Sequence, residues 1–581
     1  MLLSNSKITK AALYASLLAF IGFVVYILCK NEEVLYAAHD RSEFLYGAPF
    51  FQHLMQKPFG LMQYVGAWLT QLFYNPWVGA GVLAGIWLLI VGVGKQAFRL
   101  QGGAIALMLL PVACLLTSVV DLGYWIYLST IRGYWFSQSV AYLIMLLLLW
   151  AAQATPRRWH WAWYLVGASL YPILGWFALL FILCLVVSGK LSWRELLGVV
   201  IMLCTTSIWH GLLYSNFSLS QVSWAGLPRF VTPSDCTESL TTPFWVLGAV
   251  SLLIPLCCRY LNNAIAPVLS AAAGMVFTLS FMFEDKNYIN EMRMVRSAVD
   301  DNWQEVIDIA SAADKPTISM IMLKNVALMH EGKLLDESFK MNGNSSFPLN
   351  NPDSIQVSFL EIASPLVYYN YGMVNEAIRL SYECAVQTGF SPFYLKMLAR
   401  CVSATGEEKH QDRFLALLHH HPYYKDWHPA PVSDLIKEQK QSYEDEITGV
   451  ENTYSYIVTS VSSWYESDNK LASEQALFYS MLRCDSRRFW RSMRKYVKLH
   501  QNEAFPLHAQ EAYIMFMDKA PEEKRMMIPV EQGVYNRYKA FWERFEEMAQ
   551  SRYSKEKIEE EMHKGWGDTY WYYNLFGRKV L

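Results

Sequence analysis

Acidic and basic side chains are concentrated in one segment between the first two hydrophobic stretches, residues 31–76. Within it, Asp40, Arg41 and Glu43 fall in four consecutive positions among many aromatic side chains. A carboxylate within hydrogen-bond reach can remove a proton from an acceptor group, and a nearby guanidinium can hold an anion such as phosphate. The segment is too polar to span a bilayer and too apolar to be a plain solvated loop, which is typical of chain lying along a membrane surface.

The charges of the whole chain are unevenly distributed. Residues 1–283 contain eight acids and fourteen Lys or Arg, whereas the remainder of the 581 residues carries 43 acids and 35 Lys or Arg. We therefore expect a transmembrane bundle over 1–283 and a water-soluble domain over 284–581. The acidic second domain argues against nucleic acid as a partner. The ten cysteines form no C-x-x-C pair, so a zinc or disulfide framework has no support.

The apolar runs predict about nine membrane-spanning helices. Two runs on either side of Pro172 are short and could instead form one broken helix, which would reduce the count to eight. The nine runs cover residues 11–29, 77–94, 103–120, 137–154, 160–171, 173–188, 195–214, 243–258 and 263–283.

The distribution of Lys and Arg predicts the orientation. With nine spans and a cytoplasmic N-terminus, nine of the fourteen bases fall on the cytoplasmic side, as the positive-inside rule requires. The first loop and the C-terminal domain then share the periplasmic face of a bacterial inner membrane. Arg132, His210 and Arg229 belong to the same face. No ionisable group lies in the middle of a span, so transport is the weakest interpretation.

From residue 284 onward the pattern is helical with short polar connections. The turns around Gly332, Gly372 and Gly406 are alike, because each glycine follows a helix end and precedes an amphipathic helix that opens with acids. Gly372 and Gly406 are 34 residues apart, which is the tetratricopeptide spacing. The predicted fold class is all-α, a membrane helix bundle followed by a TPR-like α-solenoid.

Three other segments favour ordinary structural roles. The run His419-His420-His421 is more typical of a solvated helix end than of a metal site. Asp353-Ser354-Ile355 resembles the acceptor sequence for protein O-glycosylation in Bacteroidetes, although an ordinary turn is favoured. The aromatic C-terminus, residues 566–576, is expected to cap the solenoid, with membrane contact and sugar stacking as alternatives. No cofactor is expected, and a divalent metal is left open.

A carboxylate in a short loop after the first span, followed by surface helices, a bundle and an outer soluble domain, resembles the GT-C class of membrane glycosyltransferases. Those enzymes take sugars from polyprenyl-phosphate carriers. The resemblance is one of topology, without a shared motif. It implies that Asp40, or Glu43 as second choice, is the base for the acceptor. It also implies that the leaving phosphate is bound by Arg41, Arg132, His210 and Arg229.

Five stretches carry a closer resemblance: residues 57–80, 171–180, 300–310, 508–516 and 567–577. Over these, the chain resembles a family of uncharacterised multi-spanning membrane proteins of Bacteroidales. Family members have Pro-Gly-Gly-Leu where this chain has Pro58-Phe59-Gly60-Leu61, so a locally different turn is expected. Because that family has no established activity, the resemblance implies architecture and not reaction.

Two functions follow from these patterns. The first is a polyprenyl-phosphate-dependent glycosyltransferase or oligosaccharide transferase in the membrane lipid, whose solenoid selects the acceptor or binds a periplasmic protein. The second is a non-catalytic scaffold whose solenoid recruits periplasmic envelope proteins. A cavity near Asp40 that gathers Arg132, Arg229 or His210 would favour the enzyme.

Overall fold

The computed structural model describes residues 2–189, 193–231, 239–258, 260–261, 263–314, 316–340, 359–440, 453–517, 528–551 and 553–577. Within these ranges the secondary structure is helical, without a β-strand, and one isolated antiparallel bridge joins Ser129 to Phe230. The predicted all-α fold class is therefore confirmed. The glycosylation-like sequence Asp353-Ser354-Ile355 lies outside the described residues.

The chain forms two compact units. The first unit contains Met1–Glu284 together with two later pieces, Cys384–Leu395 and Leu415–Trp427. The second unit contains Asp285–Glu383, Lys396–Phe414 and His428–Leu581. Residues from three helices are divided between the units: α21 (Val374–Thr388), α22 (Pro392–Thr405) and α23 (Glu408–His419). Segments far along the chain thus belong to the same unit as the first loop.

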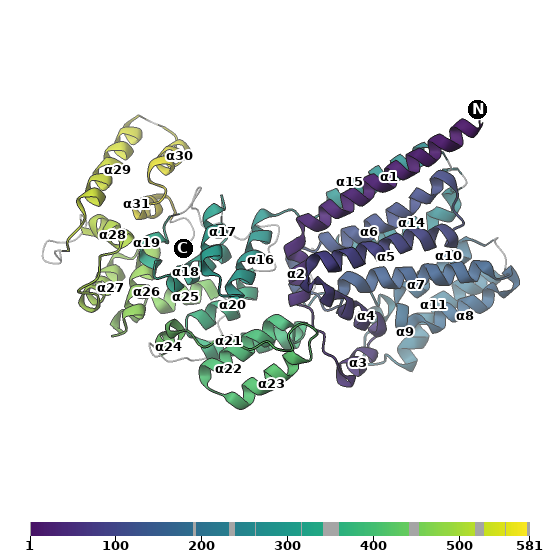
Figure 1. Ribbon diagram of the computed structural model, residues 1–581, viewed down its shortest axis with the longest axis horizontal. Helices are drawn as coiled ribbons and strands as arrows, with labels where there is room; N and C mark the ends of the chain where they lie inside the picture. The colour runs from purple at the N-terminus through teal and green to yellow at the C-terminus, as the bar shows by residue number, and fades with distance from the viewer. Residues whose placement is uncertain are drawn as a thin grey trace. The chain divides into compact units, whose positions relative to one another are not determined.

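The first unit is a bundle of apolar helices (Figure 1), in which α1 packs along α15, α6 along α14 and α15, and α5 along α7. Its α-helices are α1 (Leu2–Lys30), α2 (Glu32–Asp40), α3 (Ala48–Met55), α4 (Gly60–Thr70), α5 (Pro76–Ala97), α6 (Leu109–Val120), α7 (Tyr134–Ala154), α8 (His160–Ser169), α9 (Tyr171–Leu174), α10 (Trp176–Val187), α11 (Trp193–Leu212), α12 (Leu219–Ser223), α14 (Thr242–Cys257) and α15 (Ile265–Phe281). Short 3-10 turns are η1 (Gln71–Tyr74), η2 (Gly102–Met108), η3 (Gly123–Leu128), η4 (Arg157–Trp159) and η5 (Ser239–Thr241).

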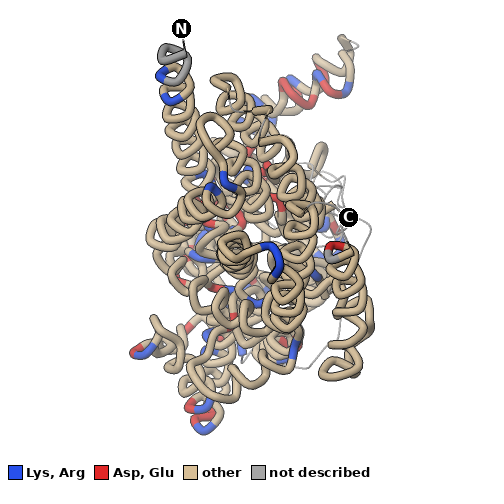
Figure 2. The backbone as a smooth tube through the Cα atoms, turned by 90° about the vertical axis from the view of Figure 1, so that its right-hand side faces the viewer, with Lys and Arg blue, Asp and Glu red and all other residues tan. Residues whose placement is uncertain are grey.

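Six helical segments of the described chain are long and apolar enough to cross a membrane, or seven if the bent pair α15 and α16 (Lys286–Val299) counts as one. Charged residues are sparse along these helices, as the mostly tan helix that begins at the label N illustrates (Figure 2). The expected count of nine is wrong by this criterion, because α8 has only 10 residues, α10 has 12 and α15 has 17. All nine apolar runs are nevertheless helical over most of their length.

The two short helices α8 and α10 pack side by side. A Cβ added to Gly167 on α8 would lie 2.8 Å from both Phe181 and Ile182 on α10. A broken helix would instead place its two halves end to end. The alternative of one span interrupted near Pro172 therefore does not describe this region.

Glycine contacts fix the beginning of α7. A Cβ on Gly66 of α4 would lie 2.4 Å from the carbonyl oxygen of Gly133, and one on Gly133 would lie 1.9 Å from the amide nitrogen of Ala67. Gly133 also has φ +62°, a conformation that favours glycine. This close approach positions Arg132 and Tyr134 on either side of Gly133.

The second unit is built from antiparallel helices whose ends carry the expected signals. Gly332, Gly372 and Gly406 all have positive φ and each separates two helices, as predicted. Side-chain caps begin α17 and α26, where Asn302 and Asn469 accept amide hydrogens. The remaining helices are α17 (Trp303–Ala312), α18 (Ile318–His330), α19 (Leu334–Glu337), α20 (Phe359–Asn370), α24 (Asp434–Lys440), α25 (Thr453–Val461), η7 (Trp464–Glu466), α26 (Lys470–Leu482), α27 (Ser486–Leu499), α28 (Leu507–Met517), α29 (Gln532–Gln550), α30 (Lys555–Trp566), α31 (Tyr570–Tyr572) and the π-turn η9 (Tyr573–Gly577).

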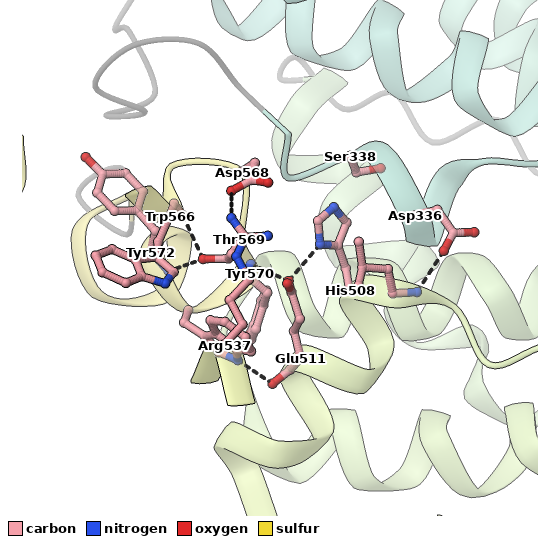
Figure 3. A network of polar contacts seen from close by, with 12 residues as sticks. Asp336, Ser338, His508, Glu511, Arg537, Trp566, Asp568, Thr569, Tyr570 and Tyr572 are labelled. Carbon is pink, nitrogen blue, oxygen red and sulfur yellow. Dashed lines mark hydrogen bonds and ion pairs between the residues drawn. The ribbon is translucent and has the colours of Figure 1, made fainter. Parts of the chain in front are cut away.

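The aromatic C-terminus is buried against α26 and α28. Figure 3 shows the polar contacts that hold it: the carboxylate of Glu511 accepts the amide hydrogen of Tyr570 at 2.8 Å and pairs with His508 Nδ1 at 2.8 Å. The indole of Trp571 donates to the carbonyl of Glu511 at 2.9 Å, and the Tyr573 hydroxyl donates to Leu482. The expectation that this segment caps the helical array is therefore confirmed.

Candidate functional site

The first-loop charges lie at the end of the short helix α2. Helix α2 begins two residues after α1 ends, and its face of Val34, Leu35, Ala37 and Ala38 is buried. Burial of this face holds α2 against the bundle. The helix ends at Asp40, and Arg41, Ser42 and Glu43 follow directly after it.

A pocket opens beside this turn, and the space between its walls, open solvent included, is about 400 Å³. One wall comes from the end of α2 and the other from the chain between α6 and α7. Two of the predicted cations, Arg41 and Arg132, line the pocket. Its other lining residues are Ala38, Ser42, Leu122, Ile126, Ser129, Ile131, Gly133, Tyr134 and Trp135.

The guanidinium of Arg41 is held by aromatic rings. Its central carbon lies 3.5 Å from the centre of the Phe393 ring, 5.0 Å from that of Tyr127 and 5.2 Å from that of Tyr394. Stacking of this kind fixes the plane of a guanidinium while leaving its N–H groups available for hydrogen bonds. Phe393 and Tyr394 belong to the piece Cys384–Leu395 of the same unit.

Two buried donors at this pocket lack a hydrogen-bond acceptor within the described ranges: Arg41 Nη1 and Ser42 Oγ. Buried polar atoms in folded proteins are nearly always hydrogen-bonded, so each such atom needs an explanation. An unfilled guanidinium nitrogen and a hydroxyl at one pocket are suited to an anionic oxygen.

Arg132 forms an ion pair with the second candidate acid, Glu43. Arg132 Nε lies 3.3 Å from Glu43 Oε2, and both side chains are 15% exposed. A Cβ on Gly389 would approach within 2.6 Å of both Arg132 Nη2 and Glu43 Oε2, so the backbone of Gly389 covers the pair.

A lysine and a histidine, Lys57 and His53, also interact with the charges of this pair. Burial and the positive charge of Arg132 lower the pKa of Lys57, while Glu43 opposes the shift. Burial and the charge of Lys57 lower the pKa of His53, also against the effect of Glu43. Burial lowers the pKa of the Arg132 guanidinium, which still remains charged. The local balance therefore favours an added negative charge.

The first-choice acid, Asp40, is 8% exposed and is not among the residues that line the pocket. Burial raises the pKa of Tyr424 well above the usual value, and the negative charge of Asp40 adds to this shift. The Tyr424 hydroxyl is 3.1 Å from His39 Nε2, and the rings of His39 and His421 meet edge to face at 5.3 Å. The expectation of a solvated histidine run is thus wrong for His421, which is 1% exposed.

The other two predicted cations lie outside the pocket lining. His210 Nε2 is 3.0 Å from the carbonyl oxygen of Phe217. The Arg229 guanidinium donates to the carbonyl of Gln221. The backbone of Arg229 is closer to the pocket-lining chain, because its carbonyl accepts the amide hydrogen of Thr130 at 2.9 Å. The structure therefore brings together Arg41, Arg132 and Glu43 and leaves His210 and Arg229 apart from them.

Sequence reasoning missed Ser42, Gly389 and Phe393. Ser42 lies between Arg41 and Glu43, but a single serine in a polar loop has no distinguishing signal. Gly389 lies in a Gly-Phe-Ser-Pro turn that predicts a break between helices. Nothing local to that turn indicates that it contacts residues 41–43, because the contact spans more than 340 positions in sequence.

The fold and the pocket define an all-helical protein with several membrane-capable helices, a pocket lined by arginine at the ends of two of them, and a helical C-terminal region. The chain belongs to the family of unknown function DUF6057, whose model matches residues 7–577. No curated protein and no solved structure matches the chain.

Proposed function

We propose that this chain is a membrane glycosyltransferase or oligosaccharide transferase that uses a sugar linked to polyprenyl phosphate. The observation that carries the proposal is the pocket lined by Arg41, Ser42 and Arg132, where two buried donors lack acceptors in the described structure. Leaving a buried donor unsatisfied costs about 1–3 kcal/mol, more for a charged group. A bound phosphate would satisfy both donors at once.

The place of the pocket supports a lipid as the phosphate carrier. Leu122 and Tyr134 of its wall adjoin α6 and α7, which belong to two of the membrane-capable segments. A polyprenyl chain among the bundle helices would present its phosphate near the ends of these helices.

The roles of the two arginines follow from the pocket, and the role of Asp40 follows from the resemblance to membrane glycosyltransferases. Arg41 and Arg132 receive the negative charge of the leaving lipid phosphate as its bond to the anomeric carbon breaks. Asp40 accepts the proton of the acceptor hydroxyl as the acceptor oxygen bonds to that carbon. Glu43 is engaged by Arg132 and so acts as a positioning residue.

We place the protein in a bacterial inner membrane, with its N-terminus in the cytoplasm and its C-terminal domain in the periplasm. The C-terminal domain is TPR-like and selects the acceptor. Contacts within the first unit support a shared compartment, because Arg41 stacks on Phe393 and Glu43 lies under Gly389. The charged residues of the first loop must then lie on the same side of the membrane as the pieces Cys384–Leu395 and Leu415–Trp427.

Binding of a polyprenyl monophosphate to the full-length protein in lipid nanodiscs tests the pocket. Arg132→Gln should weaken binding about tenfold, since it removes a charge-assisted contact. Arg229→Gln is the matched control, because Arg229 is another partly buried outer-loop arginine that does not line the pocket. Equal effects of the two substitutions would contradict the proposed phosphate site.

Catalysis is tested separately by Asp40→Asn in cells, with the envelope glycans profiled at matched protein abundance. Loss of a glycan product together with retained polyprenyl-phosphate binding is the expected result. Glu43→Gln should instead weaken binding by a few fold, because Arg132 loses its partner.

A non-catalytic scaffold is the second candidate, and one observation favours it. Asp40 is buried beside Tyr424, and Glu43 is paired and covered by Gly389, so both acids are largely removed from solvent. An unchanged glycan profile for Asp40→Asn, combined with protein partners captured by the C-terminal region, would select the scaffold.

A further inference from the structure

A group of arginines lies at the end of α7 that is farther from the pocket. Tyr134 of the pocket begins this helix, and Gln153 belongs to its last turn. A helix of 21 residues is about 30 Å long, which matches the hydrocarbon thickness of a bilayer. The two ends of α7 therefore lie near the two surfaces of a membrane that this helix spans.

Arg99 joins the end of α5 to the end of α7. Its guanidinium Nη2 donates to the carbonyl of Gln153 at 2.5 Å and has no ion pair within the described chain. The Arg99 side chain is exposed, so its remaining N–H groups face outward. The backbone of Arg99 has φ +54°, a conformation that favours glycine, and the chain nevertheless places a cation there.

The connection from α7 to α8 adds Arg157 and Arg158, both in the turn η4. Arg157 Nη2 lies 3.4 Å from Glu195 Oε1 at the start of α11. The Arg157 side chain is 43% exposed, whereas the Glu195 side chain is 4% exposed. Arg158 is exposed as well. The ion pair thus fixes one arginine against α11 and keeps part of its guanidinium on the surface.

His160 at the start of α8 shows that these charges form one cluster. Arg157, Glu195 and Arg99 all lie within electrostatic reach of its ring. Its Nδ1 atom is buried and has no hydrogen-bond partner in the described part of the chain. Three arginines against one glutamate leave an excess of positive charge at this end of the bundle, which is suited to an anionic ligand.

Exposed aromatic rings flank the cluster. Trp159 and Trp161 are 49% and 39% exposed, and their ring centres lie 6.3 Å apart in a stacked arrangement. Tryptophan is enriched at the level of lipid headgroups, where its ring contacts acyl chains and its N–H contacts water. Exposed arginines beside exposed tryptophans, at the ends of membrane-capable helices, fit a lipid headgroup better than a soluble anion.

We propose that Arg99, Arg157 and Arg158 form a binding site for the phosphate of an anionic phospholipid, at the end of α7 opposite to the pocket. Arg99 and Arg158 bind phosphate oxygens, while Arg157 is shared between the phosphate and Glu195. A zwitterionic lipid binds less tightly, because the arginines repel its ammonium group. The inference goes beyond the proposed function, since it requires a membrane and no sugar donor.

Native mass spectrometry of the full-length protein in detergent tests the site with two lipids of equal acyl chains. Phosphatidylglycerol should bind about tenfold more tightly than phosphatidylcholine, because it has the phosphate without the ammonium. The double variant Arg99→Gln with Arg158→Gln should weaken phosphatidylglycerol binding about ten- to thirtyfold, since each arginine near a headgroup contributes about 1 kcal/mol. Its binding of phosphatidylcholine should stay unchanged.

Arg487→Gln with Arg494→Gln is the matched control, because it removes two exposed arginines from α27 of the second unit. This control should bind phosphatidylglycerol like the wild type. Glu195→Gln should strengthen binding about threefold, because Arg157 is then released for the phosphate. A folding defect does not produce such a gain.

Four results would overturn the inference. Equal affinity of the wild type for both lipids would remove the anionic site, and equal losses in the site and control variants would show a response to net charge alone. Unchanged or weaker binding by Glu195→Gln would contradict the sharing of Arg157. Displacement of phosphatidylglycerol by an equal concentration of glycerol 3-phosphate would assign a soluble phosphate ester in place of a lipid.

Discussion

Phe59 occupies a backbone conformation that usually belongs to glycine. Its φ is +67°, its ring is fully buried, and the ring lies 3.2 Å from Cβ positions built on Gly175 and Gly226. The left-handed backbone conformation costs a residue other than glycine about 1–2 kcal/mol. At Pro58–Leu61 this chain therefore places a bulky ring on a left-handed turn, with the packing of the ring offsetting the strain.

Phe59→Gly should destabilise the protein by about 2–4 kcal/mol, because loss of a buried phenyl ring outweighs the relief of strain. The thermal unfolding midpoint in detergent measures this. A midpoint equal to or above that of the wild type would mean that the ring contributes little.

Glu474 of α26 gives the second unit a pH dependence. Burial, followed by the charges of Asp336, Glu503 and Glu438, raises its pKa to about 7. An acid whose folded pKa is raised makes the fold lose stability as pH rises from its unfolded pKa toward its folded pKa. Stability should therefore fall between about pH 4.5 and pH 7.

Glu474→Gln should remove this loss. Its unfolding midpoint should exceed that of the wild type at pH 8 and match it well below pH 4.5, where the glutamate is protonated in both states. Thermal unfolding across this pH range checks the prediction. A stabilisation that is the same at both pH values would show that the side chain acts by packing and not by ionisation.

At the scale of elements, the turn between α21 and α22 contacts the candidate site through Gly389. Gly389 has φ +109° and leaves no room for a Cβ beside Arg132 and Glu43. Gly406, between α22 and α23, has φ +78° but nothing within 4 Å of its Cβ position. The two glycines thus share left-handed backbone and differ in their contacts.

Gly389→Ala should weaken polyprenyl-phosphate binding several fold, because it displaces the Arg132–Glu43 pair, whereas Gly406→Ala should leave binding unchanged. Both substitutions should lower stability by about 1 kcal/mol through backbone strain. Paired binding and unfolding measurements separate the effects. Weaker binding for both variants would show that strain alone is responsible.

Local signals in the sequence were sufficient for the elements and insufficient for their contacts. The turn glycines and the aromatic cap could be predicted because capping and apolar burial depend on neighbouring residues. The lengths of α8 and α10 could not, because hydropathy does not show where two short helices fold back on each other. The contact of Phe393 with Arg41 depends on tertiary packing and has no local signal. Ser42 and Tyr134 emerged only when the pocket was described.

For the whole molecule, the account depends on one arrangement relative to the membrane. The proposed phosphate site needs the loop at Arg41 and the pieces Cys384–Leu395 and Leu415–Trp427 in one aqueous compartment, since these residues pack together in one unit. The basic connection at Arg157 and Arg158 should face the opposite compartment.

Labelling with a membrane-impermeant thiol reagent tests this arrangement most directly. Single cysteines replace three exposed residues, Gln52, Lys409 and Arg158, in a background whose native cysteines are changed to serine. The account predicts that Gln52→Cys and Lys409→Cys react in intact spheroplasts and that Arg158→Cys reacts only after permeabilisation. Labelling of Gln52→Cys and Lys409→Cys from opposite sides would contradict the shared compartment and both proposed functions with it.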